Sequence, residues 1–462
     1  MRKEVVAAIT VGAAVVGVAV FLRHWEQQRE RRLRQTKRIL RKFANDCATP
    51  AAKLWNIAND LASKMESGLS SEESILEMLV SYIAPLPTGE EKGIYYGVNL
   101  RGTNFLMIRG RLGGKNLPIS ELQREEVAIP LTAMDRDSTE ELFDLIAVEL
   151  AKFYFSAISS GSAIKWRSFS VNDTVGKELM NDINQALEKH GIDLRVFALA
   201  NDTTGDLAGA RYYSKENVAA ITLGMGTDVG YVESAEQVPK WHGQSPNSGE
   251  MIVNMQWGNF SSSYLPFTEF DAYLDAESSN PGSRMFEKLI SGMYLGEIVR
   301  RVLLKMAQET ALFGEWVPPK LATPYLLRSP DMAAMHQDTS EDFEVVDEKL
   351  KEIFEINYST PMAREIVTEV CDVVAERGAR LVGAGIVGIV KKLGRIANKK
   401  SVVTIEGGLY EHYRVFRNYL HSSVWEVLGN DLSDNVIIEN CHGGSGAGSI
   451  FLAASQTYNA DS

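Results

Sequence analysis

The stretch that ends in Asn201-Asp202-Thr203 carries the side chains best suited to acid–base chemistry. The five residues before it, Val196 to Ala200, are all apolar, which predicts a short strand buried on both faces. The polar residues then fall in the loop at the carboxyl end of that strand, where open α/β sheets bind their ligands. There Asp202 could take a proton from a substrate hydroxyl while Asn201 fixes that hydroxyl in place. Taken alone, Asp202 could equally be a helix or turn cap.

Two strand–turn–strand segments could build a site around this loop. Residues 93–108 contain the turn Gly102-Thr103-Asn104, and residues 219–232 contain Gly224-Met225-Gly226-Thr227-Asp228. Each segment predicts a β-hairpin, and the repetition suggests a duplicated, two-lobed α/β protein with a cleft between its halves. The turns offer backbone N–H groups and hydroxyls that could hold phosphates. The plainer alternative is that they are ordinary hairpin turns.

The remaining chain predicts further strands and helices of an α/β protein. We expect strands at residues 250–260, 402–405 and 436–438, the first of them ending in polar residues, and helices at residues 44–84, 140–152, 295–306 and 364–394. The glycine-rich segment 443–448 lies between a strand and a helix of small residues that runs through Ala454. Such a turn can let a nucleotide approach the backbone, or it can be a tight packing corner.

The amino end predicts a membrane anchor. Val5 to Leu22 is an uncharged apolar run, just long enough to cross a hydrocarbon core of about 30 Å. A basic segment follows it, and fewer positive charges precede it, which predicts that the main body stays in the cytosol. The alternative is a cleaved signal peptide, but no small-residue cleavage site follows the run.

Composition excludes several function classes. With 462 residues and 45% apolar content the chain is long enough for two domains. A net charge of −12 argues against nucleic-acid binding. The three cysteines are far apart, so they predict no disulfide framework and no zinc site, and they favour a reducing compartment.

Taken together, the motifs resemble the hexokinase family, and in particular its plant-type members with an amino-terminal anchor. They occur in family order from about residue 40 onward: Leu100-x-Gly102-Thr103-Asn104-Phe105, Asn201-Asp202-Thr203, Gly224-x-Gly226-Thr227, Trp257-Gly258-Asn259-Phe260, Phe286-Glu287-Lys288-Leu289-Ile290-Ser291-Gly292, Gly407-Gly408 and Gly444-Ser445-Gly446. The resemblance implies an α/β protein with the two-lobed actin-like ATPase fold of hexokinases, preceded by a transmembrane helix. It implies an anchor and basic segment over residues 1–40, a small lobe over 41–201, and a large lobe over 202–457 whose last helix returns to the small lobe.

The resemblance also implies the site. Asp202 would be the base that accepts the proton of the sugar 6-hydroxyl, and Asn201 and Glu287 would bind the sugar. Four further residues occupy sugar-site positions: Arg167, Ser168, Asp228 and Gln256. ATP with Mg²⁺ would bind over the second lobe, and its expected contacts are Asn99, Gly102, Thr103, Asn104, Gly224, Gly226, Thr227, Gly407, Gly444 and Ser445.

Several positions depart from the family pattern. The first phosphate turn of the family reads Asp-Leu-Gly-Gly-Thr-Asn-Phe-Arg; here Asn99, Arg101 and Leu106 replace the Asp, the first Gly and the Arg. Neutral Asn99 is a poorer ligand for a hard cation than a carboxylate.

The sugar site departs as well. Trp166-Arg167-Ser168-Phe169 stands where the family has Trp-Thr-Lys-Gly-Phe, and a preceding strand of the small lobe is predicted to be missing. Asp228 replaces an Asn and Gln256 replaces a Glu, while Met225 replaces a Thr and Glu406 replaces an Asp.

These departures predict a hexokinase-like protein with weak or no sugar phosphorylation and a regulatory or sugar-sensing role. The alternative is an active hexose kinase that feeds glycolysis. The resemblance implies the mitochondrial outer membrane as the location, with the body facing the cytosol, and the plastid envelope is the alternative.

Overall fold

The computed structural model divides the chain into two compact units. It describes residues 2–71, 73–81, 86–100, 104–130, 139–156, 162–167, 173–192, 194–242, 246, 248–442 and 446–458. For residues 2–22, 25, 139–141, 154–156, 162–167, 173–180, 195, 197–199 and 457–458 it describes the backbone alone. The first unit comprises residues 1–49, 266–281 and 293–377, and the second comprises 50–265, 282–292 and 378–462. Two helices, α8 (Gly292–Thr310) and α11 (Pro361–Lys392), run across the boundary in sequence.

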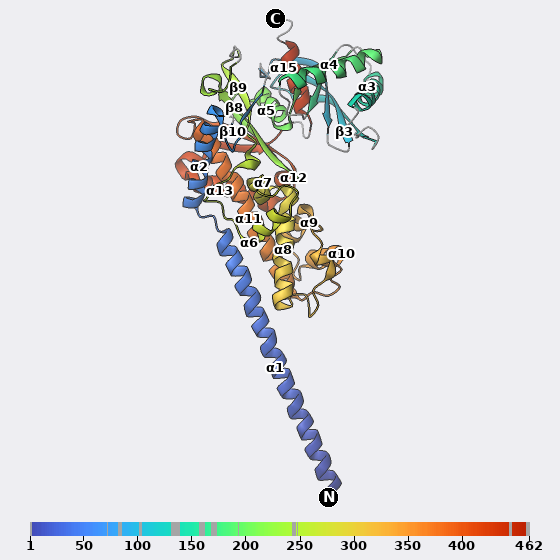
Figure 1. Ribbon diagram of the computed structural model, residues 1–462, viewed down its shortest axis with the longest axis vertical. Helices are drawn as coiled ribbons and strands as arrows, with labels where there is room; N and C mark the ends of the chain where they lie inside the picture. The colour runs from blue at the N-terminus through green and yellow to red at the C-terminus, as the bar shows by residue number, and fades with distance from the viewer. Residues whose placement is uncertain are drawn as a thin grey trace. The chain divides into compact units, whose positions relative to one another are not determined.

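The first unit is helical. Besides parts of α8 and α11 it contains α1 (Arg2–Cys47), α6 (Glu269–Glu277), α9 (Ser329–His336) and α10 (Glu344–Phe354). The second half of α1 packs through Thr36, Leu40, Phe43 and Cys47, whose spacing of three and four residues puts them on one buried face. Phe43 meets Phe270 of α6 edge to face, with ring centroids 5.3 Å apart. The amino-terminal half of α1 extends beyond the other helices of this unit (Figure 1).

The apolar run predicted as a membrane anchor falls in this amino-terminal half of α1. Its side chains lie outside the described residues. Within the part of the chain that the structure describes, no helix has the length and apolarity needed to cross a membrane.

The second unit contains two mixed sheets. The five-stranded sheet has the order β4-β3-β2-β5-β6, formed by Ser120–Ala128, Asn104–Gly113, Lys92–Leu100, Ser162–Arg167 and Leu194–Ala200. The six-stranded sheet has the order β1-β9-β8-β7-β10-β11, formed by Leu79–Val80, Glu250–Asn254, Thr227–Ser234, Asn217–Leu223, Ser401–Glu406 and Val436–Asn440.

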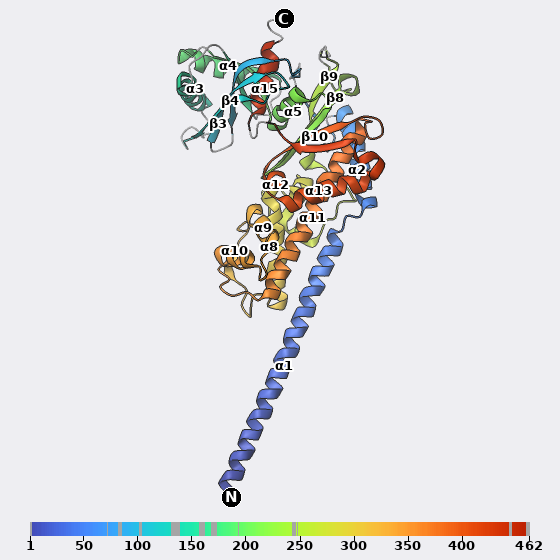
Figure 2. The ribbon, with the colours of Figure 1, turned by 180° about the vertical axis from the view of Figure 1, so that it is seen from behind.

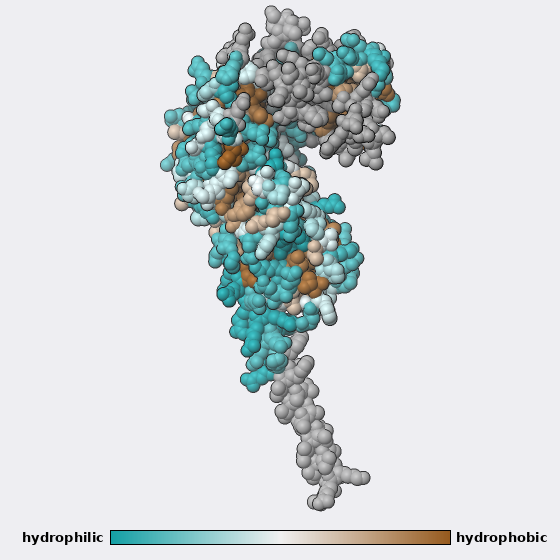
Figure 3. Space-filling view, viewed as in Figure 1, coloured by the Kyte–Doolittle hydropathy of each residue, from teal (hydrophilic) through white to brown (hydrophobic). Residues whose placement is uncertain are grey.

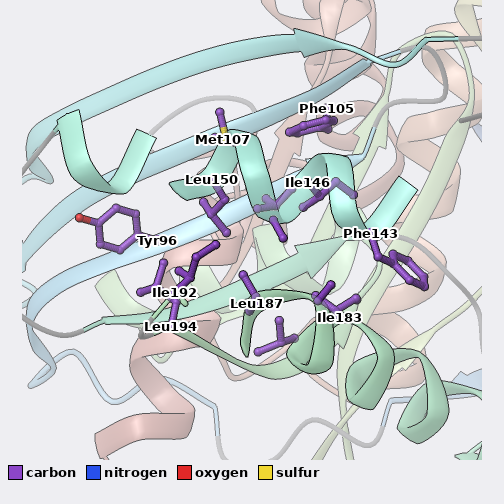
Figure 4. Close-up of a cluster of buried hydrophobic side chains, with 14 of the residues drawn as sticks. Tyr96, Phe105, Met107, Phe143, Ile146, Leu150, Ile183, Leu187, Ile192 and Leu194 are labelled. Atoms are coloured by element: carbon purple, nitrogen blue, oxygen red, sulfur yellow. The ribbon is translucent and has the colours of Figure 1, made fainter. Parts of the chain in front are cut away.

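Helices cover both faces of the five-stranded sheet because its strands alternate two apolar faces. Tyr96, Val98, Phe105 and Met107 point to one face and pack on α3 (Thr139–Ser156) and α4 (Asp173–Lys189), as Figure 4 shows. Their neighbours Tyr95, Leu106 and Ile108 point to the other face and pack on α15 (Gly448–Tyr458). Both ribbon views place α15 against this sheet (Figure 1, Figure 2).

The other helices of this unit connect or flank the six-stranded sheet. They are α2 (Ala51–Ser70), α5 (Asp202–Tyr213), α7 (Met285–Ile290), α12 (Gly408–Glu411), α13 (Arg414–Leu428) and α14 (Asn430–Ser433). Helix α5 follows directly on β6 and packs against β7, β8 and α15. It therefore joins the two sheets at the point where Asn201 and Asp202 lie.

One prediction of local structure is wrong. The helical pattern over residues 44–84 breaks after α2, and Leu79–Val80 instead pairs antiparallel with β9, because its backbone completes the edge of that sheet. The segment before Trp166, where a strand of the small lobe is predicted to be missing, includes residues 157–161, which lie outside the described residues. Ser162–Arg167, which contains Trp166, forms β5 and pairs in parallel with both β2 and β6, although its registered pairing with β2 is short.

Candidate functional site

Asn201 and Asp202 occupy the turn from β6 into α5. Asn201 is the residue that caps the helix: its Oδ1 accepts hydrogen bonds from Thr204 N at 2.9 Å and from Thr203 Oγ1 at 3.2 Å. Asp202 is the first residue of the helix. Its carboxyl is thus held at the carboxyl end of a buried strand, as the sequence predicts, while the capping role falls to its neighbour.

A polar network joins this turn to the second hairpin. Asp228 Oδ2 accepts from Gln256 Nε2 at 2.9 Å and from Asn254 Nδ2 at 2.7 Å, and Oδ1 accepts from Val229 N at 2.8 Å. Asn254 Nδ2 also lies 3.4 Å from Thr203 Oγ1, which donates to Asn201. The two sugar-site substitutions predicted from sequence, Asp228 and Gln256, are therefore direct partners, and they are linked to the loop of Asp202.

Burial sets the ionisation of this network. Removal from water raises the pKa of the Asp228 carboxyl to about 6, against the opposing effects of the Asn254 and Val229 hydrogen bonds and the charge of Arg284. Gln256 reaches Asp228 from a left-handed backbone conformation, with φ of 52°. A residue with a side chain adopts that conformation at a cost, and such residues concentrate at functional sites.

Glu287 on α7 is fixed from two sides. Its carboxylate accepts from Thr227 N at 3.1 Å and from the guanidinium of Arg284, with one of those contacts at 3.0 Å. Thr227 Oγ1 in turn accepts from Trp257 Nε1 at 2.9 Å. A sugar hydroxyl that donates to Glu287 would therefore join Thr227 N and the Arg284 guanidinium as donors to the same carboxylate.

The glycines of the second hairpin and of the 407–408 segment come together. Gly407 has φ of 119°, and a Cβ there would lie 2.5 Å from Leu223 O, so only glycine fits. Gly292 N donates to Gly224 O at 2.8 Å. No described atom lies within 4 Å of a Cβ placed on Gly224, so a ligand can approach its backbone. The open backbone at Gly224 suits the phosphate contact predicted there, whereas a Cβ placed on Gly226 would lie 3.0 Å from the Glu287 carboxylate and Gly407 N already donates to Glu411 at 3.0 Å.

The first hairpin presents a different surface. Asn99 on β2 is 2% exposed, and within the described residues its Oδ1 accepts no hydrogen bond. Leu106, its registered partner on β3, is also buried and packs toward Gly446. Asn104 donates to Glu126 of the neighbouring strand β4. Gly102 and Thr103, the turn itself, lie outside the described residues.

Four other residues predicted to contact the sugar or the nucleotide also lie wholly or partly outside the described part of the chain. Arg167 ends β5, but its side chain is not described, and Ser168, Gly444 and Ser445 belong to segments that the structure leaves out. The adjacent Gly446 has φ of 83° and lies beside Asn99. A Cβ placed on Gly446 would be 3.3 Å from Asn99 Nδ2. The glycine-rich segment therefore ends next to β2.

The residues fit the two parts of ATP with Mg²⁺ unequally. The open backbone at Gly224 suits a phosphate, and Gly407 brings the second glycine segment beside it. Mg²⁺ is usually held by one or two carboxylates together with substrate phosphates. The buried orphan oxygen at Asn99 is an uncharged amide, and the described residues contain no group of three acidic, histidine or cysteine side chains placed to hold a metal. The backbone at Gly224 therefore suits a phosphate, and Asn99 offers a metal a neutral oxygen in place of a carboxylate.

Two residues that shape the site, Asn254 and Arg284, were not among the candidates predicted from sequence, and Trp257 was named only as part of a motif. Asn254 bridges Asp228 to Thr203, Arg284 holds Glu287, and Trp257 fixes Thr227. Asn254 ends a strand whose three central residues are apolar, and that polar ending is a signal in the sequence. Arg284 lies three residues before Glu287, a spacing that brings the two side chains together at the start of a helix and is also visible in the sequence.

Comparison with known proteins places these features in one context. Two protein-family sequence models, both described as hexokinase, match the chain. One matches residues 218–455, and the other matches residues 39–156 and 154–212. Together they cover both sheets and the α5 junction.

Full-length relatives match as well. Hexokinase-1 of Spinacia oleracea is 46% identical over 491 residues, covering 99% of this chain and 98% of the relative. Hexokinase-1 of Arabidopsis thaliana is 46% identical, with 98% and 97% covered. The spinach alignment is longer than the 462 residues of this chain, so that relative has residues that this chain lacks.

Solved structures show the same fold. A hexokinase from Schistosoma mansoni complexed with glucose is 25% identical, with a TM-score of 0.77, and covers 91% of this chain and 99% of its own.

Proposed function

Because the chain belongs to the hexokinase family, we propose that it binds a hexose and ATP but transfers the phosphoryl group slowly or not at all. Its role is then regulatory, in sugar sensing or in competition with active hexokinases. The relatives named hexokinase and the glucose-bound structure support a hexose as the ligand. The substitutions in the first phosphate turn support slow transfer.

Sugar binding is supported by the retained residues. Asn201 and Asp202 are held at the β6–α5 turn, Glu287 is fixed nearby in the same unit, and Gln256 with Asp228 keeps one amide and one carboxylate in contact. Such fixed groups lower the entropic cost of holding a ligand. In this proposal Asp202 accepts the proton of the sugar hydroxyl.

The main support for slow phosphoryl transfer is Asn99. Its buried amide stands at the position where the family has a carboxylate. Phosphoryl transfer depends on positioning and on charge neutralisation by metal ions. Loss of one such electrostatic contact costs on the order of 10²–10³ in rate. Mg²⁺ bound to the nucleotide would supply that neutralisation, and Asn99 would face it with a neutral amide where the family has a negative charge.

The test is glucose binding measured by calorimetry together with ATP-dependent phosphorylation, both on the full chain. Binding without ordinary turnover supports the proposal. The alternative function is an active hexose kinase, which retention of Asn201, Asp202 and Glu287 favours. That alternative predicts both sugar-dependent stabilisation of the fold and product formation that Asp202→Ala abolishes.

The second part of the proposal concerns location. We propose that residues 5–22 anchor the chain in the mitochondrial outer membrane, with the body in the cytosol; the apolar run and the basic segment after it support this. Imaging of the full chain fused at its carboxyl end to a fluorescent reporter tests it. A signal on the plastid envelope favours the alternative location, and a secreted reporter contradicts the anchor.

A further inference from the structure

The segment of α1 just after the apolar run is rich in arginine. Five arginines lie between residues 23 and 34, against the two carboxylates Glu26 and Glu30. The chain as a whole has a net charge of −12, so this positive segment contrasts with the rest of the protein. The visible surface of this part of α1 is hydrophilic in Figure 3.

Four of the arginines on α1 form one exposed row. Arg31, Arg34, Arg38 and Arg41 are all exposed and recur at spacings of three and four residues, which places them on one helix face. The opposite face, with Thr36, is buried, and Arg32 at its edge forms a bidentate ion pair with Glu315.

The exposed row has few internal partners. Within the described part of the chain Arg31, Arg38 and Arg41 form no ion pair, and Arg34 lies 3.9 Å from the exposed carboxylate of Glu30. An exposed pair at that separation contributes little. These guanidinium groups are therefore available to an external anion.

Distance along the helix decides which of them can reach a membrane. With about 1.5 Å per residue, Arg31 and Arg34 lie roughly 13 and 18 Å beyond Leu22, while Arg38 and Arg41 lie roughly 24 and 28 Å beyond it. The headgroup layer is about 5–7 Å thick on each side, and charges act through about 8 Å of physiological salt solution. Helical side chains point toward the helix amino terminus, which here is toward the apolar run. Arg31 and Arg34 thus reach the headgroup field, and Arg38 and Arg41 do not.

We propose that Arg31 and Arg34 bind anionic lipid headgroups and so hold the helical unit at the surface of a negatively charged membrane. Free phosphate in solution is a poorer occupant, because the row is spread over an open helix face and no enclosed site surrounds it. This inference rests on the proposed anchor, since the distances are counted from Leu22. The proposal predicts that Arg31 and Arg34 contact the headgroups and that Arg38 and Arg41, on the same helix face, do not.

The chain provides its own matched control. Arg38 and Arg41 repeat Arg31 and Arg34 seven residues later, which on an α-helix is nearly the same face. The variants Arg31→Gln/Arg34→Gln and Arg38→Gln/Arg41→Gln therefore remove equal charge from equally exposed positions that differ in their distance from the apolar run.

The experiment is cell-free synthesis of the full chain with two separable vesicle populations, phosphatidylcholine alone and phosphatidylcholine with phosphatidylserine. Protein that resists alkaline extraction is counted in each population. Wild type is expected to favour the anionic vesicles, and raised salt should reduce that preference. A basic residue near the surface contributes about fivefold, so the Arg31/Arg34 variant should lose about 25-fold in preference. The Arg38/Arg41 variant should stay within about twofold of wild type.

The outcomes are distinguishable. Equal losses in both variants, or no loss in the Arg31/Arg34 variant, would overturn the lipid contact while leaving the anchor in place. If no sample contains extraction-resistant protein, the anchor itself is wrong and the lipid contact falls with it. Hexose binding, measured on the same variants, should be unchanged in every case.

Discussion

Gln256 donates its side-chain amide to the carboxylate of Asp228 across 2.9 Å, so two substitutions that lie 28 residues apart form one hydrogen-bonded pair. By the family pattern these positions hold a carboxylate and an amide in the opposite order. The pair therefore keeps its charge and its hydrogen bond, although the two side chains have exchanged roles. If only one of the two residues had changed, two amides or two carboxylates would face each other.

This exchange predicts strong coupling between the two positions. Gln256→Glu alone places a second carboxylate against Asp228 and should lower the free energy of unfolding by about 1–3 kcal/mol at neutral pH. The double variant Asp228→Asn/Gln256→Glu should recover most of that loss, because one amide and one carboxylate face each other again. A double-mutant cycle from denaturant unfolding measures the coupling. Additive effects of the two single changes would show that the pair is not a unit.

The ionisation of Asp228 predicts a pH dependence of stability. Burial raises the pKa of this carboxyl to about 6 from an ordinary value near 3.8, so the folded chain binds the proton more tightly than the unfolded chain does. The stabilising contribution is then fully present below about pH 4 and is lost as pH rises through about 6, by up to about 3 kcal/mol. The check is the difference in unfolding free energy between wild type and Asp228→Asn across this range. A difference that does not change with pH would contradict the burial effect.

Adjacent glycines give a test of the backbone at the predicted nucleotide site. Gly407→Ala should destabilise the fold by several kcal/mol, since its Cβ would meet Leu223 O at 2.5 Å and its φ of 119° is unsuited to alanine. Gly408→Ala is the matched control, because a Cβ there meets only His412 at 3.8 Å. Thermal unfolding of both variants measures the contrast. Equal stability of the two variants would show that residue 407 is not constrained as described.

Asn99 gives the most direct route to restoring catalysis. Asn99→Asp supplies a carboxylate at the buried position and should raise Mg²⁺–ATP-dependent turnover on the order of tenfold to 10²-fold. Without Mg²⁺–ATP the new buried charge should lower stability by about 1–3 kcal/mol. Steady-state kinetics and unfolding with and without nucleotide check both effects, with Asn99→Ala as the control. A restored carboxylate that leaves turnover unchanged would place the defect elsewhere in the turn.

The sequence pattern predicted the regular parts of this fold well. The strand at Val196–Ala200 lies within β6, and the hairpins predicted around residues 93–108 and 219–232 are β2–β3 and β7–β8. These segments either alternate apolar and polar residues or are continuously apolar, so the sequence pattern predicts that they are buried. The long helices near residues 295–306 and 364–394 are α8 and α11 for the same reason.

Other elements have no such signal. Strand β4 is mostly exposed and carries charged residues, and it is a strand because β3 offers it an open edge. Strand β5 contains the shortened family motif at Trp166, and it is a strand because β2 and β6 supply hydrogen bonds on both sides. The site follows the same division. The motif identified Asp202 and Glu287, but the contact of Asn254 with Asp228 depends on the packing of two strands that are 26 residues apart.

The central claim is that this chain binds hexose yet transfers phosphate poorly, and one paired measurement tests it most directly. Glucose binding by calorimetry and ATP-dependent glucose phosphorylation are measured on the same preparation of the full chain, with Glu287→Gln and Asp202→Ala as controls. We predict saturable glucose binding that Glu287→Gln weakens, with turnover on the order of 10²-fold or more below the usual kinase range of about 1–100 s⁻¹. Turnover within that range, abolished by Asp202→Ala, would contradict the account.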